Sequence, residues 1–402
     1  MQTRLADWIR DTPQGREAED ILRACVHCGF CNATCPTYRL LGDELDGPRG
    51  RIYQMKQMFE GGAVSTRTLT HLDRCLTCRN CETTCPSGVR YGRLLDIGRE
   101  AIAGRVDRSL PSRWLRTSLR WFLKSSLFGA SLDVARLLRP ALRERLRRRI
   151  PAARPAGARP QERHARRMLV LEGCVQPELS PDINAAAARV LDRLGIELVG
   201  IRGCCGALDQ HLGATEAARE QMRRNIDAWW PEIENGAEAI VMTASGCGVL
   251  VKDYGHLLAD DAQYAHKAAR IAALTRDLSE VLANVDLSPL AVTPRRIAFH
   301  PPCTLQHGQK LRGVVEGILG RLGFELLPFA DSHLCCGSAG TYSILQPSIA
   351  GKLRDDKLAA LHAAAPELIA TANIGCQTHL ATASRVPVVH WITLLDPSPP
   401  NA

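Results

Sequence analysis

Short apolar runs alternate with alanine-rich segments of helical periodicity from residue 167 to the end of the chain. Residues 168–171 and 196–201 are typical of buried strands, and residues 183–194 between them are typical of a helix. Strands separated by helices usually pair in parallel, because a helical crossover returns the chain to the same end of the sheet. The pattern therefore predicts α/β architecture for this part of the chain.

The same order of elements and cysteines occurs twice. The first copy consists of strand 168–171, Cys174, helix 183–194, strand 196–201, Cys204-Cys205-Gly206, strand 239–243 and Cys247. The second copy consists of strand 296–300, Cys303, helix 314–322, strand 324–329, Cys335-Cys336-Gly337, strand 368–372 and Cys376. The gaps between cysteines are 30 and 42 residues in the first copy and 32 and 40 in the second. This regularity predicts an internal duplication.

Each copy places its cysteines where the predicted strands end. The carboxyl edge of a parallel sheet is where open α/β folds collect their ligands, so we expect one site per copy. The expected sites are Cys174, Cys204, Cys205 and Cys247 in the first copy, and Cys303, Cys335, Cys336 and Cys376 in the second. An additional iron-sulfur cluster, a zinc ion, and buried structural cysteines without a metal are the alternatives for these thiols.

The N-terminal region carries a different cysteine pattern, C-x2-C-x2-C-x3-C-P, and carries it twice. In this motif three thiolates usually bind one 4Fe-4S cluster, and the fourth binds the other cluster of the pair. The spacing therefore predicts one cluster on Cys25, Cys28, Cys31 and Cys85, and a second on Cys35, Cys75, Cys78 and Cys81. Zinc and disulfides are the alternatives, but neither explains a third cysteine at the same interval followed by Cys-Pro.

Residues 51–60 and 66–74, between the two motifs, have the periodicity of helices. This insertion is longer than that of a compact bacterial ferredoxin, so the region resembles the helical ferredoxin domain of the succinate dehydrogenase family. The segment Pro48-Arg49-Gly50-Arg51 brings cations to the predicted clusters, where positive charge raises a reduction potential. A solvated surface loop is the alternative for this segment.

Residues 105–167 form a strongly basic segment. They contain 18 Lys and Arg against 4 Asp and Glu, a balance of +14, whereas the whole chain carries +9. Apolar residues recur there at helical spacing, which predicts one or two basic helices followed by a linker over 151–166. The segment could dock on anionic lipid headgroups or on an acidic partner subunit, or serve as a solvated connector. It has no recognisable nucleic-acid-binding fold, so we expect no nucleic acid partner.

Length and composition set the remaining limits. At 402 residues and 45% hydrophobic content, the chain is long enough for two or three domains. We expect a helical ferredoxin domain at 1–104, a basic helical connector at 105–166, and α/β modules at 167–290 and 291–402. Sixteen cysteines in tight clusters on so long a chain favour metal ligation over disulfides. Without a signal peptide or a long apolar run, we expect a cytoplasmic protein, peripheral on the inner face of the plasma membrane.

The duplicated pattern resembles the cysteine-rich CCG domain, which occurs in heterodisulfide reductase, in anaerobic glycerol-3-phosphate dehydrogenase and in lactate-utilisation proteins. In that domain each copy ends in Cys-x-x-Cys, whereas here Leu250 and His379 occupy the last position. The missing thiols argue against a noncubane cluster of the heterodisulfide reductase type. His379 and His300 are candidates to replace them, and a surface or capping histidine is the alternative for each.

Over nearly its whole length the chain is similar to the iron-sulfur subunits of glycolate dehydrogenase, also called glycolate oxidase. The most specific stretch runs from Cys25 through Tyr38 to Ile52. The resemblance implies the electron-transfer subunit of an enzyme complex, in which separate FAD-binding subunits oxidise glycolate and this chain, without catalytic residues of its own, passes electrons to a membrane quinone. The absence of a GxGxxG or P-loop motif agrees with a subunit that binds no nucleotide. The alternatives are the equivalent subunit of a lactate or glycerol-3-phosphate dehydrogenase, and a catalytic subunit like that of heterodisulfide reductase.

Overall fold

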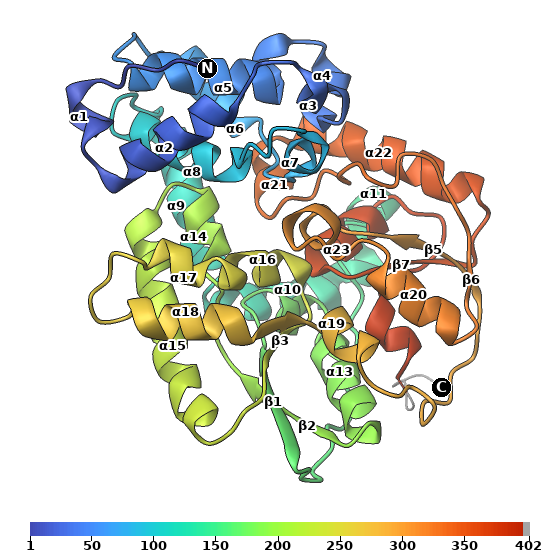
Figure 1. Cartoon of the computed structure of the whole chain (residues 1–402). Helices are drawn as coiled ribbons and strands as arrows, with labels where there is room; N and C mark the ends of the chain where they lie inside the picture. The colour runs from blue at the N-terminus through green and yellow to red at the C-terminus, as the bar shows by residue number, and fades with distance from the viewer. Residues whose placement is uncertain (397–402) are drawn as a thin grey trace.

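The computed structural model, which describes residues 1–396, begins with a helical domain, drawn in blue to cyan in Figure 1. Its helices are α1 (Asp7–Arg10), α2 (Pro13–Ala24), α3 (Phe30–Ala33), α4 (Pro36–Leu41), α5 (Pro48–Phe59), α6 (Thr66–Asp73), α7 (Asn80–Thr84) and α8 (Tyr91–Ala103), with a 3-10 turn η1 (Glu44–Asp46). The apolar faces of α2, α5 and α8 meet around Leu22, Met55 and Leu94, which are fully buried. Helices α5 and α6 correspond to the two helices predicted between the cysteine motifs.

The two halves of the chain beyond the connector each contain one four-stranded parallel sheet. The first sheet has the order β2-β1-β3-β4, with β1 (Arg166–Leu171), β2 (Ile196–Ile201), β3 (Ile240–Met242) and β4 (Thr275–Asp277). The second has the order β6-β5-β7-β8, with β5 (Arg296–His300), β6 (Glu325–Leu326), β7 (Leu368–Thr371) and β8 (Val388–His390). All neighbouring strands run parallel. The matching orders confirm the predicted α/β architecture and duplication.

Helices cover both sheets. In the first module they are α12 (Gln176–Leu179), α13 (Asp182–Arg193), α14 (Ala207–His211), α15 (Thr215–Glu234), α16 (Ser245–Lys252), α17 (Tyr254–Leu257), α18 (Ala265–Leu274) and α19 (Leu278–Ala283). In the second they are a π-helical turn η3 (Thr304–Gly308), α20 (Val314–Arg321), α21 (Tyr342–Leu345), α22 (Pro347–Ala363), α23 (Ile374–Ala381) and η4 (Trp391–Leu394). Residues 397–402 of the module predicted at 291–402 lie outside the described part.

The two modules share a hydrophobic core. Ile183 and Val190 of α13, in the first module, lie in one buried cluster with Phe299 and Trp391 of the second. Burial of apolar surface between the modules stabilises both of them, by roughly 25 cal/mol for each Å² removed from water. The two modules lie side by side in Figure 1, and their shared core leads us to expect that they fold as one cooperative body.

The sixth strand is shorter than predicted. The pattern predicts a strand over 324–329, but β6 covers only Glu325–Leu326. It is an edge strand that pairs with β5 alone. The amide of Leu327 still donates to the carbonyl of Ile297 at 2.9 Å, but Pro328 has no N–H to continue the ladder.

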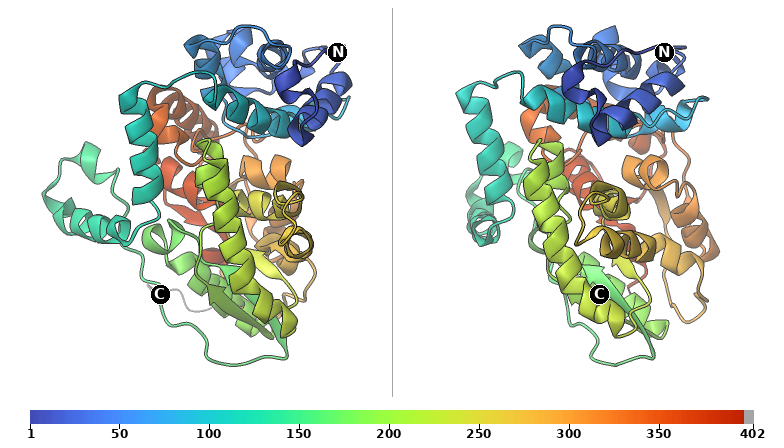
Figure 2. Two further views of the ribbon diagram at one scale, coloured as in Figure 1. Left: turned by 90° about the vertical axis from the view of Figure 1, so that its left-hand side faces the viewer. Right: turned by 60° about the vertical axis from the view of Figure 1, so that its left-hand side comes forward.

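The connector consists of α9 (Leu110–Phe122), α10 (Ser126–Leu138), a 3-10 turn η2 (Arg139–Ala141) and α11 (Glu144–Arg147), and it lies at the left edge of both views in Figure 2. Residues 151–165 then reach β1 without a helix or strand. Basic side chains of α9 face the protein: Arg116 pairs with Asp73 at 2.8 Å and Arg120 pairs with Asp209 at 2.7 Å. Trp114, on the same helix, is 72% exposed. The helix therefore turns part of its charged face inward and its apolar face toward solvent.

Candidate metal centres

The first cavity of the N-terminal domain is lined by Cys25, Cys28, Cys31 and Cys85. Three of these thiols come from the segment that links α2 to α3 and continues into α3, and the fourth directly follows α7. His27 and Gly29 adopt left-handed backbone conformations (φ 60° and 86°), which curl the loop so that its cysteines face one point. The structure thus brings together the first predicted set of ligands.

The second cavity is lined by Cys35, Cys75, Cys78 and Cys81. The loop between α6 and α7 repeats the curl of the first loop, because Thr77 and Arg79 have φ values of 54° and 56°. Arg79 stands where the first loop has a glycine, and its guanidinium pairs with Asp253 of the first module at 2.8 Å. The second predicted set is also brought together.

The prolines that follow the fourth cysteines explain why those thiols cross over to the other cavity. Cys35 and Cys85 have nearly the same extended backbone, with φ −81° and ψ 117° for Cys35 and φ −76° and ψ 116° for Cys85. The ring of a proline disfavours the helical region for the residue that precedes it. Helices α3 and α7 therefore stop, and each fourth thiol points away from the three that precede it.

The two cavities are direct neighbours. Pro48, Cys81 and Tyr91 line both of them, so a single layer of side chains separates the two predicted centres. The hydroxyl of Tyr91 donates to the Sγ of Cys75 at 3.6 Å, and hydrogen bonds of this kind tune the potential of a cluster. The arrangement suits the passage of single electrons between two centres.

The protonation state of these thiols depends on whether a metal binds them. All sixteen cysteines are free of disulfides. Burial raises the pKa of Cys31 to about 11 and raises the pKa values of Cys78 and Cys81 well above the usual range, so these thiols stay neutral unless a cation binds them. A metal must supply the positive charge that keeps buried thiolates ionised. Four thiols in each cavity are the donor set that a 4Fe-4S cluster requires, so the residues present fit that group.

Arg51 is buried beside the second cavity. Its guanidinium pairs with Asp46 at 3.3 Å and donates to the carbonyl of His71 at 2.7 Å and to the hydroxyl of Thr37 at 3.1 Å. The alternative of a solvated surface loop is therefore wrong for Arg51, whereas Arg49 is partly exposed. A buried cation that lies close to thiolates raises the reduction potential of the centre that they bind.

The cysteines of the first cysteine-rich module gather at the carboxyl edge of its sheet. They are Cys174 after β1, Cys204 and Cys205 after β2, and Cys247 in the first turn of α16. Hydrogen bonds from Cys174 and Cys205 lower the pKa of Cys204 well below the usual range, and Lys124, which follows α9, acts in the same direction. The four thiols therefore lie close enough together to influence one another and form one site.

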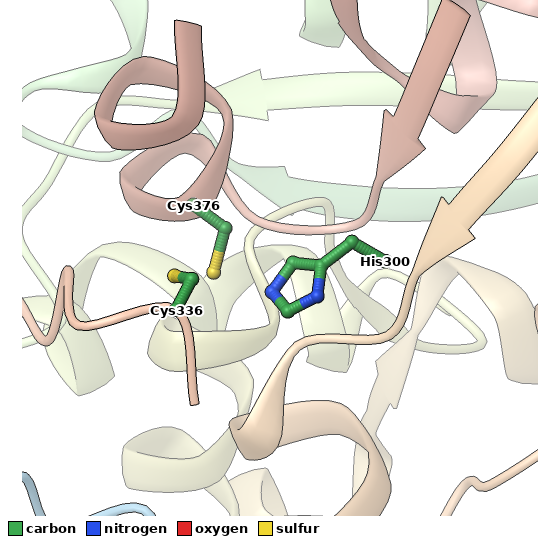
Figure 3. A group of neighbouring side chains, drawn as sticks. All are labelled: His300, Cys336 and Cys376. Carbon is green, nitrogen blue, oxygen red and sulfur yellow. The ribbon is translucent and has the colours of Figure 1, made fainter. Parts of the chain in front are cut away.

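In the second module Cys303, Cys335, Cys336 and Cys376 occupy the equivalent positions, and the Sγ atoms of Cys303 and Cys335 lie 3.8 Å apart. A histidine joins this site: the ligand atoms of His300, Cys336 and Cys376 all lie within 4.8 Å of one another (Figure 3). His300 comes from the end of β5 and is fully buried. Burial lowers its pKa well below the usual range, so the imidazole is neutral. The other candidate, His379, instead contacts the carbonyl of Ala350 at 3.2 Å.

The glycine of each Cys-Cys-Gly triplet is required by the backbone. Gly206 and Gly337 have φ values of 93° and 89°, in the left-handed region. A Cβ atom on Gly337 would lie 2.7 Å from the carbonyl oxygen of Ala350, in α22. Only glycine lets the chain turn here and bring both preceding thiols to the site.

The second module also touches the second N-terminal cavity, a relationship that no sequence pattern reveals. Cys78 lies in one buried cluster with Cys303, Cys335 and Tyr342. The hydroxyl of Tyr342 donates to the carbonyl of Arg74 at 3.0 Å and fixes this contact. The segments that meet here are too far apart in the chain for any local signal to pair them.

Comparison with known proteins agrees with this geometry. Residues 21–89 match the family model of a 4Fe-4S dicluster domain, and residues 168–252 and 297–381 match that of a cysteine-rich domain, CCG. The chain is 58% identical to the glycolate oxidase iron-sulfur subunit of Escherichia coli K12 over 98% of both proteins. The chain belongs to the family of glycolate oxidase iron-sulfur subunits. Members of this family are iron-sulfur proteins that transfer electrons within an oxidoreductase complex.

More distant relatives match different lengths of the chain. The probable glycolate oxidase iron-sulfur subunit of Bacillus subtilis 168 is 31% identical over 92% of this chain and 90% of its own length. Lactate utilization protein A of Bacillus licheniformis is 28% identical, but over 50% of this chain and 85% of its own length. The match to glycolate oxidase iron-sulfur subunits therefore spans the ferredoxin and cysteine-rich regions together, whereas the lactate utilization match spans about half of the chain.

Proposed function

We propose that this chain carries electrons away from the FAD-bearing subunits of a glycolate-oxidising complex through two 4Fe-4S clusters. One cluster is held by Cys25, Cys28, Cys31 and Cys85, and the other by Cys35, Cys75, Cys78 and Cys81. A flavin receives two electrons when it accepts a hydride, and a 4Fe-4S cluster exchanges one electron at a time. Two clusters can therefore reoxidise the flavin in single-electron steps. The observation that carries the proposal is the pair of neighbouring cavities, each lined by four thiols.

The first cavity is the side on which a partner subunit docks. Cys28 is exposed, and its neighbours Val26 and Phe30 are 68% and 62% exposed. Exposed apolar residues around a redox site are typical of a protein interface. The second cavity, in contrast, borders the second cysteine-rich module, because Leu76 and Cys78 from its wall share a buried cluster with Cys303. Electrons from the flavin subunit therefore enter at Cys28.

The acceptor is a quinone of the plasma membrane, and the connector holds the complex at the inner surface of that membrane. Among the described residues, no helix is both long and apolar enough to span a bilayer. The connector instead exposes large apolar side chains, which are Leu110, Trp114, Leu115, Trp121, Leu127, Val134, Leu137, Leu138 and Leu146. Arg113, Arg143 and Arg149 form no ion pair within residues 1–396 and can reach anionic headgroups. Aromatic and basic residues together are the composition of an interfacial membrane anchor.

The two cysteine-rich modules add further thiol sites next to this pair of clusters. Their four-thiol sites can hold a further iron-sulfur cluster or a zinc ion, and the second of them lies against Cys78. The residues that approach Cys78 from this side are Cys303 and Cys335. A redox-active group held there continues the path, whereas zinc ends it at the second N-terminal cluster.

Substrate-driven reduction of the assembled complex tests this function. The chain is copurified anaerobically with its FAD-bearing subunits, glycolate is added, and the visible absorbance of the iron-sulfur clusters is followed. We expect glycolate to bleach the clusters, and we expect the isolated chain to show no change. Bleaching by lactate or glycerol 3-phosphate but not by glycolate would overturn the assignment of the substrate. A complex whose flavin is reduced while the clusters stay oxidised would overturn the electron-transfer role.

A further inference from the structure

His300 is unusual because it is fully buried and neither of its ring nitrogens has a hydrogen-bond partner among the described residues. Buried polar groups are nearly always hydrogen-bonded, so two unpartnered nitrogens in one ring need an explanation. The ring lies at the end of β5 and points toward the sulfur atoms of Cys336 and Cys376 (Figure 3). A ring nitrogen that serves as a metal ligand explains this arrangement.

The other buried histidines near these sites have partners. Nε2 of His390 donates to the carbonyl of Thr243 at 2.9 Å. His307 contacts the carbonyl of His333 at 2.9 Å and the hydroxyl of Thr83 at 3.0 Å. Burial alone therefore does not leave a histidine unpartnered in this protein.

The duplication supplies an internal comparison. Three residues before its first cysteine the second module has His300, whereas the first module has Leu171 at the same position. Leu171 lies in an apolar cluster that includes Cys205 of the first site. Because the fold accepts a leucine there, the histidine of the second module is not required for packing.

A second difference between the modules also lies next to the second site. Lys357 of α22 is buried, donates to the carbonyl of Asp331 at 2.5 Å, and lies close enough to Cys335 and Cys336 to feel their charge. The first module has Ile226 at the corresponding position, 21 residues after the second cysteine of its triplet. A buried cation offsets the charge of metal-bound thiolates in the second site.

The position of the second site favours iron. Imidazole and thiolate ligands suit both zinc and iron. The cluster of side chains that contains Cys303 and Cys335 also contains Cys78, a predicted ligand of the second N-terminal cluster. Iron changes its oxidation state and can exchange electrons with a neighbouring cluster, whereas zinc has no redox chemistry.

We propose that the second cysteine-rich module holds an iron centre in which the imidazole of His300 is a ligand beside the thiolates of Cys336 and Cys376. Cys303 and Cys335 complete the donor set, while the first module has thiols alone. As a further donor beside four thiols, a neutral imidazole adds no negative charge, so the centre has a higher reduction potential than one with a thiolate at this position. The inference goes beyond the proposed function, which requires only the eight N-terminal cysteines.

Metal analysis of the full chain tests the inference. Iron and zinc per chain are measured in anaerobically purified wild type and in the Cys336→Ala, His300→Leu and His379→Leu variants. Cys336→Ala defines the iron that belongs to the second module. We expect His300→Leu to lose the same share of iron, and His379→Leu, the matched control from α23, to keep it. Wild-type iron content in His300→Leu, no loss in Cys336→Ala, or zinc in place of this iron would each overturn the proposal.

A second variant covers the case in which His300→Leu does not fold. His300→Cys keeps a metal ligand, so its iron content should equal that of the wild type while the redox midpoint of one centre shifts to a lower potential. An unchanged midpoint would overturn the role of His300. The electron paramagnetic resonance signals of the N-terminal clusters are recorded on the same samples. Absence of these signals from the wild type would contradict the proposed function. If the signals are present in every variant, a failure of the His300 proposal leaves the proposed function intact.

Discussion

Cys78 of the N-terminal domain lies against Cys303 of the second cysteine-rich module, in one buried cluster of side chains. Asn80 strengthens this junction, because its amide donates to the carbonyl of His333 at 3.2 Å. The contact joins a thiol of one predicted centre to a thiol of another within the protein interior. The helical domain and the second module are therefore parts of a single array of sulfur sites.

Removal of the buried cation beside the second cavity should destabilise the N-terminal domain. Arg51→Met leaves the buried carboxylate of Asp46 with one partner fewer, and breaking a buried ion pair typically costs about 3 kcal/mol or more. Arg49→Met, the matched control, breaks a partly exposed pair with Glu44, and we expect a loss of less than about 1 kcal/mol. Urea denaturation measures both values. Equal losses in the two variants would contradict the role given to Arg51.

The glycine of the second Cys-Cys-Gly triplet should tolerate no side chain. Gly337→Ala forces alanine into the left-handed region and against the carbonyl of Ala350, so we expect a loss of about 2 kcal/mol or more in the free energy of unfolding. Gly351→Ala, in α22, meets no atom within 4 Å and should be stabilising by about 0.5–1 kcal/mol. Thermal unfolding of the two variants compares them. The prediction fails if Gly337→Ala is as stable as the wild type.

The α/β modules can be predicted well from the sequence because their strands and helices follow local patterns. The duplication is visible in the spacing of cysteines alone, and the structure gives both halves the same strand order. The two N-terminal ligand sets follow from the Cys-Pro pairs, whose effect on Cys35 and Cys85 is also local. These parts of the fold need no knowledge of distant contacts.

Other features depend on tertiary contacts, and local patterns do not predict them. β4 and β8, at Thr275–Asp277 and Val388–His390, are too short for any periodicity to reveal them. The inward face of α9 depends on Asp73 and Asp209, which lie in other parts of the chain. Sequence patterns do not distinguish His300 from His379, because only the fold shows which of the two meets the thiols.

The exposed aromatic residues of the connector should contribute to membrane binding. In sedimentation with vesicles that contain phosphatidylserine, Trp114→Ser together with Trp121→Ser should weaken binding by about tenfold, because both side chains are largely exposed and apolar. Ile344→Ser, an exposed apolar residue outside the connector, should have no effect. If the wild type binds its FAD-bearing partner subunits but not the vesicles, this surface instead belongs to a protein interface.

Acid should destabilise the protein partly through His390. Burial lowers the pKa of His390 to about 4 from its usual value near 6.5, and Arg154 acts in the same direction. Between these values the unfolded chain binds a proton that the folded chain does not, so stability falls as the pH drops from 6.5 to 4 and is unaffected by this group above 6.5. The loss is on the order of 3 kcal/mol. His390→Gln should flatten this part of the stability profile, and an unchanged slope would contradict the assignment.

Electron paramagnetic resonance of the dithionite-reduced full chain, recorded for four cysteine variants, tests the two crossed ligand sets most directly. Cys85→Ala should perturb the same centre as Cys28→Ala, and Cys35→Ala the same centre as Cys78→Ala, with about eight irons in the N-terminal sites of the wild type. The account is contradicted if Cys85→Ala perturbs the centre of Cys78, or if anaerobically purified wild type contains neither iron nor acid-labile sulfide.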